Sequence, residues 1–252
     1  MIFSKALHTE PKTKRLVWLH GWGNNHRWLM PLADYFCSEF ENYVLDLPGF
    51  GESTTPDSIW GVQEYAQAIH DWLATLEEKP TYFIGHSFGG KLSVVLANEY
   101  PKNVAGIVLL AAAGMKVKRN FFLKIKIFII KHLTPIAKLF EKITGLNLRE
   151  RFGGLVGSSD YNNTSGIMRR ILIKAANETI YEYTNKVSCP ALIIYGNLDT
   201  VTPPYMGSEY AELIKKAKLV LLDDIDHNTI LTSARFQVQN LINDFINHSK
   251  ES

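Results

Sequence analysis

Six short stretches of the chain are apolar at nearly every position, and most are separated by segments with one apolar face. The apolar stretches are rich in β-branched and aromatic residues and lie at 15–20, 43–47, 81–86, 104–112, 191–196 and 218–222. Continuous rather than alternating hydrophobicity is typical of strands buried on both faces, as in a parallel sheet. Apolar residues at helical spacing occupy 28–40, 61–77, 88–99, 207–216 and 231–247. The pattern predicts an α/β fold, with helices covering both faces of a mostly parallel central sheet.

The alternation of strand and helix stops between residues 115 and 186. Within this segment, FFLKIKIFIIKHL at 121–133 predicts one helix, and Thr134 with Pro135 predicts the start of a second one. Gly145 is suited to end that second helix in a left-handed conformation. We therefore predict one α/β core, made of residues 1–114 and 187–252, with residues 115–186 inserted between two strands as a helical cap.

Charge is distributed unevenly along the 252 residues. The net charge is +2 overall, but residues 115–186 carry +9 and the remainder carries −7. Lys124, Lys131 and Lys138 are spaced seven apart, which places them on one face of a helix. In one interpretation these lysines stay in water while apolar residues cover a pocket. In the other, the basic face attracts an acidic acyl carrier protein or an anionic membrane surface. The negative remainder argues against nucleic acid as a partner.

Several classes of protein are disfavoured by what the sequence lacks. Cys37 and Cys189 lie far apart and form no CxxC pattern, so we expect reduced thiols and a cytoplasmic location. The first 14 residues have no apolar stretch of signal-peptide length, and no apolar run reaches the roughly 18 residues of a membrane span. The eight histidines show no metal-binding spacing. We expect neither a metal nor another cofactor.

A glycine-rich turn supplies the first candidate for chemistry. The stretch GHSFG at residues 85–89 fits G-x-S-x-G, and it follows a predicted strand and opens a predicted helix, which is the context that this motif requires. Small neighbours let the backbone turn sharply and lift the serine hydroxyl above the sheet. The sequence therefore predicts Ser87 as a nucleophile, with the Phe88 N–H at the helix start able to bind a developing oxyanion.

A serine hydroxyl needs a base, and the base needs an acid that orients it. Asp199 and His227 each follow a predicted strand, in the order serine, acid, histidine expected for such a sheet. Carboxyl ends of parallel strands meet at one edge, where α/β proteins build their sites. Asp223, Asp224 and Asp226 are alternative acids because they lie beside the histidine, although a solvated acidic loop also explains them. We predict Asp199 as the acid and His227 as the base.

The loop after the first predicted strand supplies a second oxyanion donor. Its sequence, HGWG at residues 20–23, contains two glycines that let the backbone turn, so that the Trp22 N–H faces a substrate carbonyl beside the N–H of Phe88. We interpret His20 as a structural hydrogen-bonding residue of this loop rather than as a base.

Together these motifs resemble the α/β-hydrolase family. HGWG, LDLPGFGES, GHSFGG, GNLDTVTP and DHN occur in the family's order, and the resemblance spans about residues 15–247. It implies an eight-stranded, mostly parallel sheet with a helical cap inserted after the sixth strand, where residues 115–186 lie. The segment ahead of the first apolar stretch is short for the family's opening hairpin, so we expect that the first of the eight strands is missing.

The resemblance also implies roles for individual residues. It makes Ser87 the nucleophile, Asp199 the acid and His227 the base, and it gives the oxyanion N–H groups to Trp22 and Phe88. The first half of the chain is similar to small capped esterases, including those that cleave pimeloyl-carrier-protein methyl esters. No metal ligand is implied.

Three functions remain open from the sequence. The leading hypothesis is a serine hydrolase that cleaves carboxylic esters or thioesters of a small or acyl-chain substrate through an acyl-enzyme on Ser87. The same triad also serves hydrolases of carbon–carbon bonds in diketone-like substrates. A third possibility is a non-catalytic module that binds an acyl ligand, which would require a broken triad. A dehalogenase is disfavoured because it would need a carboxylate in place of Ser87.

Overall fold

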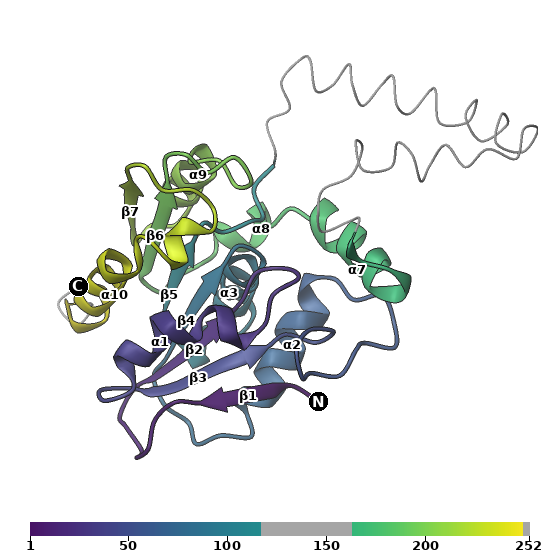
Figure 1. Ribbon diagram of the computed structural model, residues 1–252, viewed down its shortest axis with the longest axis horizontal. Coiled ribbons are helices and arrows are strands. Elements are labelled where there is room, and N and C mark those ends of the chain that lie inside the picture. The colour runs from purple at the N-terminus through teal and green to yellow at the C-terminus, as the bar shows by residue number, and fades with distance from the viewer. Residues whose placement is uncertain (117–162, 249–252) are drawn as a thin grey trace, which may run out of the picture.

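A seven-stranded sheet forms the centre of the computed structural model, which describes residues 1–116 and 163–248 (Figure 1). The strand order is β1-β3-β2-β4-β5-β6-β7, and only the β1–β3 pair is antiparallel. The strands are β1 Phe3–Ala6, β2 Arg15–Leu19, β3 Glu41–Asp46, β4 Thr81–His86, β5 Val104–Leu110, β6 Ala191–Gly196 and β7 Ala217–Leu222. The prediction of a mostly parallel sheet is confirmed.

The first strand was not among the six predicted from apolar stretches. β1 lies at the sheet edge, and its four residues are partly or fully exposed, so it carries no continuous apolar run. The described residues form seven strands, one fewer than the resemblance implies. This number fits the expectation that the first of the eight strands is missing, in which case β5 is the sixth strand of the full set and the insertion follows it.

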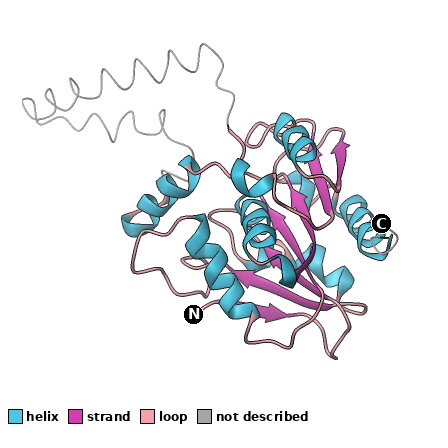
Figure 2. Ribbon diagram, turned by 180° about the vertical axis from the view of Figure 1, so that it is seen from behind, coloured by secondary structure: helices cyan, strands magenta, loops and turns pink. Residues whose placement is uncertain are grey.

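Helices cover both faces of the sheet (Figures 1 and 2). One face is covered by α1 (Met30–Ala33) and α10 (Arg235–His248), and the other by α2 (Val62–Leu73), α3 (Phe88–Glu99), α8 (Tyr181–Thr184) and α9 (Tyr205–Leu213). Successive residues of a strand belong to the hydrophobic cores on opposite faces of the sheet. Phe83 packs with α2 and α3 on one face, whereas Ile84 packs with α1 and α10 on the other. Burial on both faces is the reason that the strands read as continuous apolar stretches.

The predicted helix 28–40 is not one continuous helix. The chain forms η1 (His26–Trp28), the single turn α1 and η2 (Asp34–Phe36) in succession. Pro31 lies inside this region, and proline lacks the N–H that a helix interior requires. A proline near the start of a short helix is tolerated, which explains why α1 begins at Met30.

The insertion is described only at its two ends. Its second end contains α7 (Gly166–Asn177) and α8, and three apolar side chains bury this end against the core: Ile171, Ala175 and Ile180. The predicted helices at 121–133 and after Thr134, with Lys124, Lys131 and Lys138, lie outside the described residues. Because these parts of the insertion are not described, the bounds of the cap stay a prediction.

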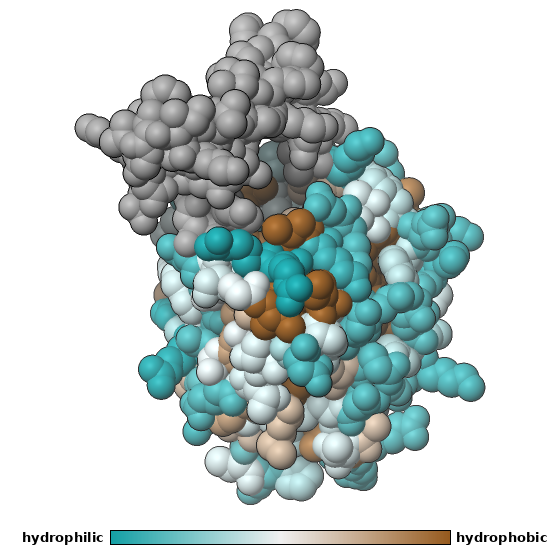
Figure 3. Space-filling model, turned by 90° about the vertical axis from the view of Figure 1, so that its right-hand side faces the viewer, coloured by the Kyte–Doolittle hydropathy of each residue, from teal (hydrophilic) through white to brown (hydrophobic). Residues whose placement is uncertain are grey.

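Beside the segment drawn in grey, hydrophobic patches alternate with polar surface (Figure 3).

Within the described ranges, none of the helices has the length and apolar character needed to cross a membrane. The same part of the chain brings together no group of three or more histidine, cysteine or carboxylate side chains that could hold a metal ion. Cys37 and Cys189 are both free thiols.

Candidate active site

Ser87 occupies a strained turn between β4 and α3. Its φ of +51° and ψ of −111° are unusual for a residue with a side chain, and such strain is typical of functional turns. The surrounding glycines make the turn possible: a Cβ on Gly85 would lie 2.3 Å from the backbone of Gly89, and one on Gly89 would lie 2.0 Å from the Leu19 oxygen. The Ser87 backbone is held on both sides, donating to Leu110 O and accepting from Ala113 N, each at 2.9 Å.

Asp199 and His227 come together at the carboxyl edge of the sheet. Asp199 follows β6 and His227 follows β7, and His227 Nδ1 lies 2.8 Å from Asp199 Oδ2. The two strands are parallel neighbours in the sheet, which is why residues 28 positions apart in the sequence can meet. The structure thus joins two of the three residues predicted to form a catalytic triad.

Four donors surround the Asp199 carboxylate. Oδ1 accepts from the backbone N–H groups of Val201 and Thr202, both at 2.8 Å, and Oδ2 accepts from Thr202 Oγ1 at 2.9 Å and from His227. Burial alone would raise the pKa of Asp199, but the hydrogen bonds from His227 and Thr202 outweigh it and the pKa is lowered. The carboxylate is therefore ionised near neutral pH, and the proton of neutral His227 belongs on Nδ1, leaving Nε2 free to accept.

The alternative acids face other partners. Asp223 accepts from Asn197 Nδ2 at 3.0 Å, and Asp226 accepts from the backbone N–H groups of Asn228 and Thr229. Asp224 has a positive φ of +57° and lies in the same exposed turn. None of the three side chains forms a hydrogen bond or a close ion pair with the His227 ring in the described part of the chain.

Trp22 and Phe88 are placed near each other by the loop after β2 and the start of α3. Their rings meet edge to face with centroids 5.4 Å apart. Neither backbone N–H donates to a protein acceptor within the described residues. Two free N–H groups, one next to Ser87 in the chain and one in a loop that lines the same cavities, are what an oxyanion site needs, and their role stays a prediction.

His20 and His86 form the scaffold around this loop. His20 Nε2 accepts from the Leu47 N–H at 3.0 Å, so Nδ1 carries the proton and donates to Gly21 O at 2.7 Å. His86 Nε2 donates to the His227 carbonyl at 2.9 Å and so links the serine turn to the loop that carries His227. Burial lowers the pKa of His20 to about 4 and that of His86 to about 3, so both rings are neutral near pH 7.

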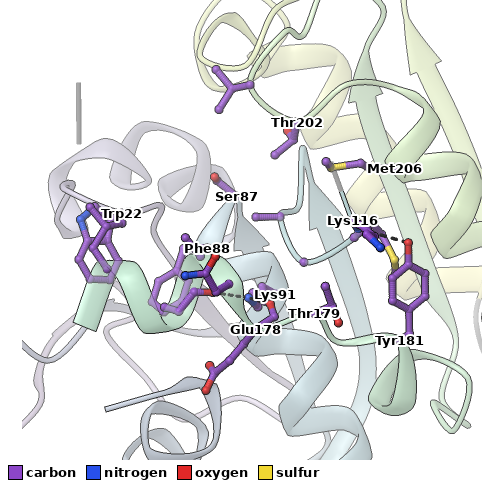
Figure 4. A pocket seen from close by; sticks show the side chains of 18 of the residues that line it. Trp22, Ser87, Phe88, Lys91, Lys116, Glu178, Thr179, Tyr181, Thr202 and Met206 are labelled. Carbon is purple, nitrogen blue, oxygen red and sulfur yellow. Dashed lines mark hydrogen bonds between the residues drawn. The ribbon is translucent and has the colours of Figure 1, made fainter. Parts of the chain in front are cut away.

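Two cavities meet at Ser87, and Trp22 and Val201 also line both of them. The larger, of about 940 Å³, lies between α3, α7, α8 and α9 (Figure 4). The smaller, of about 630 Å³, is lined by the loop 21–24, Phe50, Met168 and His227. Ser87 and His227 share the smaller cavity but are not hydrogen-bonded to each other.

The sequence reasoning missed two buried polar residues of this site. Thr202 Oγ1 lies 3.0 Å from His227 Nδ1 and 2.9 Å from Ala111 O, as well as near Asp199. Lys91 lies on α3 and lines the larger cavity. The position of a lysine within the largely apolar stretch that follows Ser87 was a signal that could have pointed to Lys91. Nothing in the sequence pattern pointed to Thr202.

Comparison with known proteins gives a consistent picture. The family model described as "alpha/beta hydrolase fold" matches residues 14–126. The chain is 23% identical to a pimeloyl-[acyl-carrier protein] methyl ester esterase of Neisseria meningitidis, over 88% of this chain and 73% of that protein. It is 24% identical to Lipase 3 of a Moraxella species, over 84% and 71% of the two chains. The solved enol-lactonase of Burkholderia xenovorans superposes with a TM-score of 0.74 at 17% identity, covering 98% of this chain and 96% of that one.

Proposed function

Because this chain is an α/β-hydrolase-fold protein, we propose that it is a serine hydrolase that cleaves carboxylic ester or thioester bonds. The observation that carries the proposal is the Asp199–His227 pair, with 2.8 Å between Oδ2 and Nδ1, at the same sheet edge as the strained Ser87 turn. Relatives that are named as a methyl ester esterase and as a lipase support ester cleavage as the reaction class.

The proposed reaction has two halves. Ser87 Oγ attacks the carbonyl carbon while His227 Nε2 takes the hydroxyl proton, and the N–H groups of Trp22 and Phe88 bind the resulting oxyanion. His227 then gives the proton to the leaving oxygen or sulfur, and the acyl group stays on Ser87. Water, deprotonated by the same ring, attacks the acyl-enzyme; the bond to Ser87 Oγ breaks, the ring returns the proton to Oγ, and the acid is released.

The linings of the two cavities support a proposal for where the two parts of the substrate bind. A leaving group must lie on the side of Ser87 from which His227 can protonate it. His227 lines the smaller cavity and is absent from the lining of the larger one. We therefore place the alcohol or thiol portion in the smaller cavity and the acyl portion in the larger cavity, between α3 and α7.

We also propose that residues 115–186 act as a cap over this site. The described end of the segment supplies Met168 to the smaller cavity and α7 residues to the larger one. The basic part of the segment, 115–151, carries a net charge of +8. An acidic acyl carrier or an anionic membrane surface is the partner that this charge favours, and a relative named for an acyl-carrier-protein substrate supports the carrier.

A substrate panel tests the reaction class. We expect measurable hydrolysis of p-nitrophenyl and thioester acyl substrates, and no cleavage of 1,3-diketones at matched concentration. Faster turnover of the diketones would identify a carbon–carbon bond hydrolase that uses the same residues. Binding of acyl ligands with no turnover of either class would contradict the proposal and identify a binding module.

The pH dependence of the ester reaction follows from the protonation of the site. We expect the rate to rise between about pH 5 and 8, where a histidine base loses its proton. The lowered pKa of Asp199 keeps that carboxylate ionised over this range, and the lowered pKa values of His20 and His86 keep both rings neutral, so none of these three groups accounts for the rise. Initial rates with a neutral ester check this, and a flat profile in folded protein would contradict a histidine base.

Thr202 gives a further test of the acid–base pair. Replacing it with valine keeps the shape but removes the hydroxyl that donates to Asp199 Oδ2. Because a hydrogen bond to a charged group contributes about 1.5–3 kcal/mol, we expect turnover to fall roughly 10-fold or more. Thr202→Ser, which restores the hydroxyl, should recover most of the rate. Equal rates for the wild type and Thr202→Val would show that the hydroxyl does not help to orient the pair.

A further inference from the structure

Lys91 lies one helical turn after Ser87 and is almost completely buried. Its backbone N–H donates to Ser87 O at 3.2 Å, and only 2% of the residue is exposed. Its side chain extends along the larger cavity (Figure 4). A buried ammonium is unfavourable unless polar groups surround it, so its partners indicate why it is there.

The partners of Lys91 belong to the end of α7. Nζ donates to the carbonyl oxygens of Ala175, at 2.5 Å, and of Glu178. Ala175 is in the last turn of α7 and Glu178 is its C-cap residue. Carbonyls at a helix end lack partners within the helix and carry partial negative charge, which a cation stabilises. In the described part of the chain no carboxylate oxygen lies within 4.0 Å of Lys91 Nζ, the limit for an ion pair. The two carbonyls are therefore the groups that hold the ammonium.

The other charged groups near Lys91 point elsewhere. Burial lowers the pKa of Lys91 to about 8, and the negative charge of Glu178 partly opposes this effect. The Glu178 carboxylate accepts from the Val62 N–H at 2.9 Å, at the start of α2. Lys116 and Glu209 also line the cavity: the Lys116 backbone N–H donates to the Tyr181 hydroxyl, and that hydroxyl donates to the Glu209 carboxylate.

We propose that Lys91 is a positioning residue that determines acyl-chain specificity, because it holds the end of α7 against the nucleophile helix and so fixes the far wall of the acyl cavity. The proposal rests on the proposed function, which places the acyl group in this cavity. Leu172, Ala175 and Ala176 of α7 line it. We expect an acyl chain of several carbons to reach this wall and an acetyl group to stay beside Ser87.

The decisive variant is Lys91→Met, which keeps an unbranched side chain but cannot donate. We expect its kcat/KM for a p-nitrophenyl hexanoate to fall about 10-fold, mainly through KM, while p-nitrophenyl acetate changes by less than about 2-fold. The matched control is Lys174→Met. Lys174 also joins α7 to the core, through Glu64 at 3.3 Å, but its side chain is 37% exposed and it does not line the cavity. An exposed ion pair of this kind contributes little, so both esters should react as in the wild type.

The charge of Lys91 gives a readout that a purely structural role would not change. In the wild type, the ratio of hexanoate to acetate kcat/KM should fall as pH rises through about 8, since the neutral amine binds the α7 carbonyls less strongly. Taking the ratio cancels any effect of pH that both esters share. Lys91→Arg keeps its charge, so its ratio should stay flat to pH 9.5, and Lys91→Met should be flat and low.

A measurement without any ester tests the role of Lys91 separately from the proposed hydrolase function. Amide hydrogen exchange over residues 166–186 should be faster in Lys91→Met than in the wild type or in Lys174→Met. Equal losses on both esters, or unchanged exchange and an unchanged ratio, would overturn the role of Lys91. If the wild type cleaves no ester while Lys91→Met still loosens α7, the proposed function fails and the attachment of α7 by Lys91 stands.

Discussion

Replacing Ser87 with alanine should reduce ester turnover by about 10⁴-fold or more and leave the fold intact. Nucleophile, base and acid act as a unit, so loss of the nucleophile removes nearly all of the triad's contribution. The hydrogen bonds that hold the turn, to Leu110 O and from Ala113 N, involve only the Ser87 backbone and survive the substitution. The strained φ of +51° is set by the chain around the turn, and the hydroxyl has no described protein partner to lose.

Two measurements check this expectation. A fluorophosphonate should add one phosphonyl group to the wild type, seen by intact mass, and none to Ser87→Ala. Ser93→Ala is a matched control, because Ser93 is a buried serine of α3, six residues after Ser87, whose hydroxyl donates to Gly89 O at 3.0 Å. The control should keep its labelling and its rate. Labelling or full esterase activity in Ser87→Ala would mean that another residue is the nucleophile.

The sequence predicted the inner strands, which are buried on both faces, and missed one of the two edge strands. β2 to β6 appear as apolar stretches because both sides of each strand meet a helix layer, and β7 was found at the other edge because its sequence is apolar, although only Leu222 of β7 is fully buried. β1 lies at the edge, where partly exposed residues such as Ser4 and Lys5 break the pattern. The turn at Ser87 was predictable because its steric requirement is local: the clashes that exclude side chains at 85 and 89 involve a short motif and the strand beside it.

At the site, the sequence did not predict side-chain contacts between segments that lie far apart in the chain. The ends of parallel strands indicated that Asp199 and His227 could meet. Thr202 was not foreseen, because its hydroxyl matters only once the turn after β6 meets Ala111 at the end of β5. The sequence marks Lys91 as unusual but does not reveal its role, since its partners lie 84 and 87 residues away in α7 and its cap.

The choice of acid gives the second large effect. We expect Asp199→Asn to lower turnover on the order of 10⁴-fold because it favours the wrong tautomer of His227. The backbone N–H groups of Val201 and Thr202 both point at Oδ1, so the amide oxygen of the asparagine should occupy that position. Its NH₂ group then faces His227 Nδ1, which must accept. The ring proton moves to Nε2, and the nitrogen that should take the proton from Ser87 is no longer a base.

The matched substitution Asp226→Asn separates this mechanism from a general effect of negative charge beside the histidine. The Asp226 carboxylate accepts from the N–H groups of Asn228 and Thr229, a role that an asparagine oxygen can also fill. We therefore expect the rate of Asp226→Asn to stay within about 3-fold of the wild type. Asp223→Asn and Asp224→Asn should have rates close to that of Asp226→Asn. Rates with a soluble ester, compared at equal folded fraction by circular dichroism, decide between the acids. If Asp226→Asn is the crippling change and Asp199→Asn is mild, the acid is Asp226, and the hydrogen bond between Asp199 and His227 serves only to place the ring.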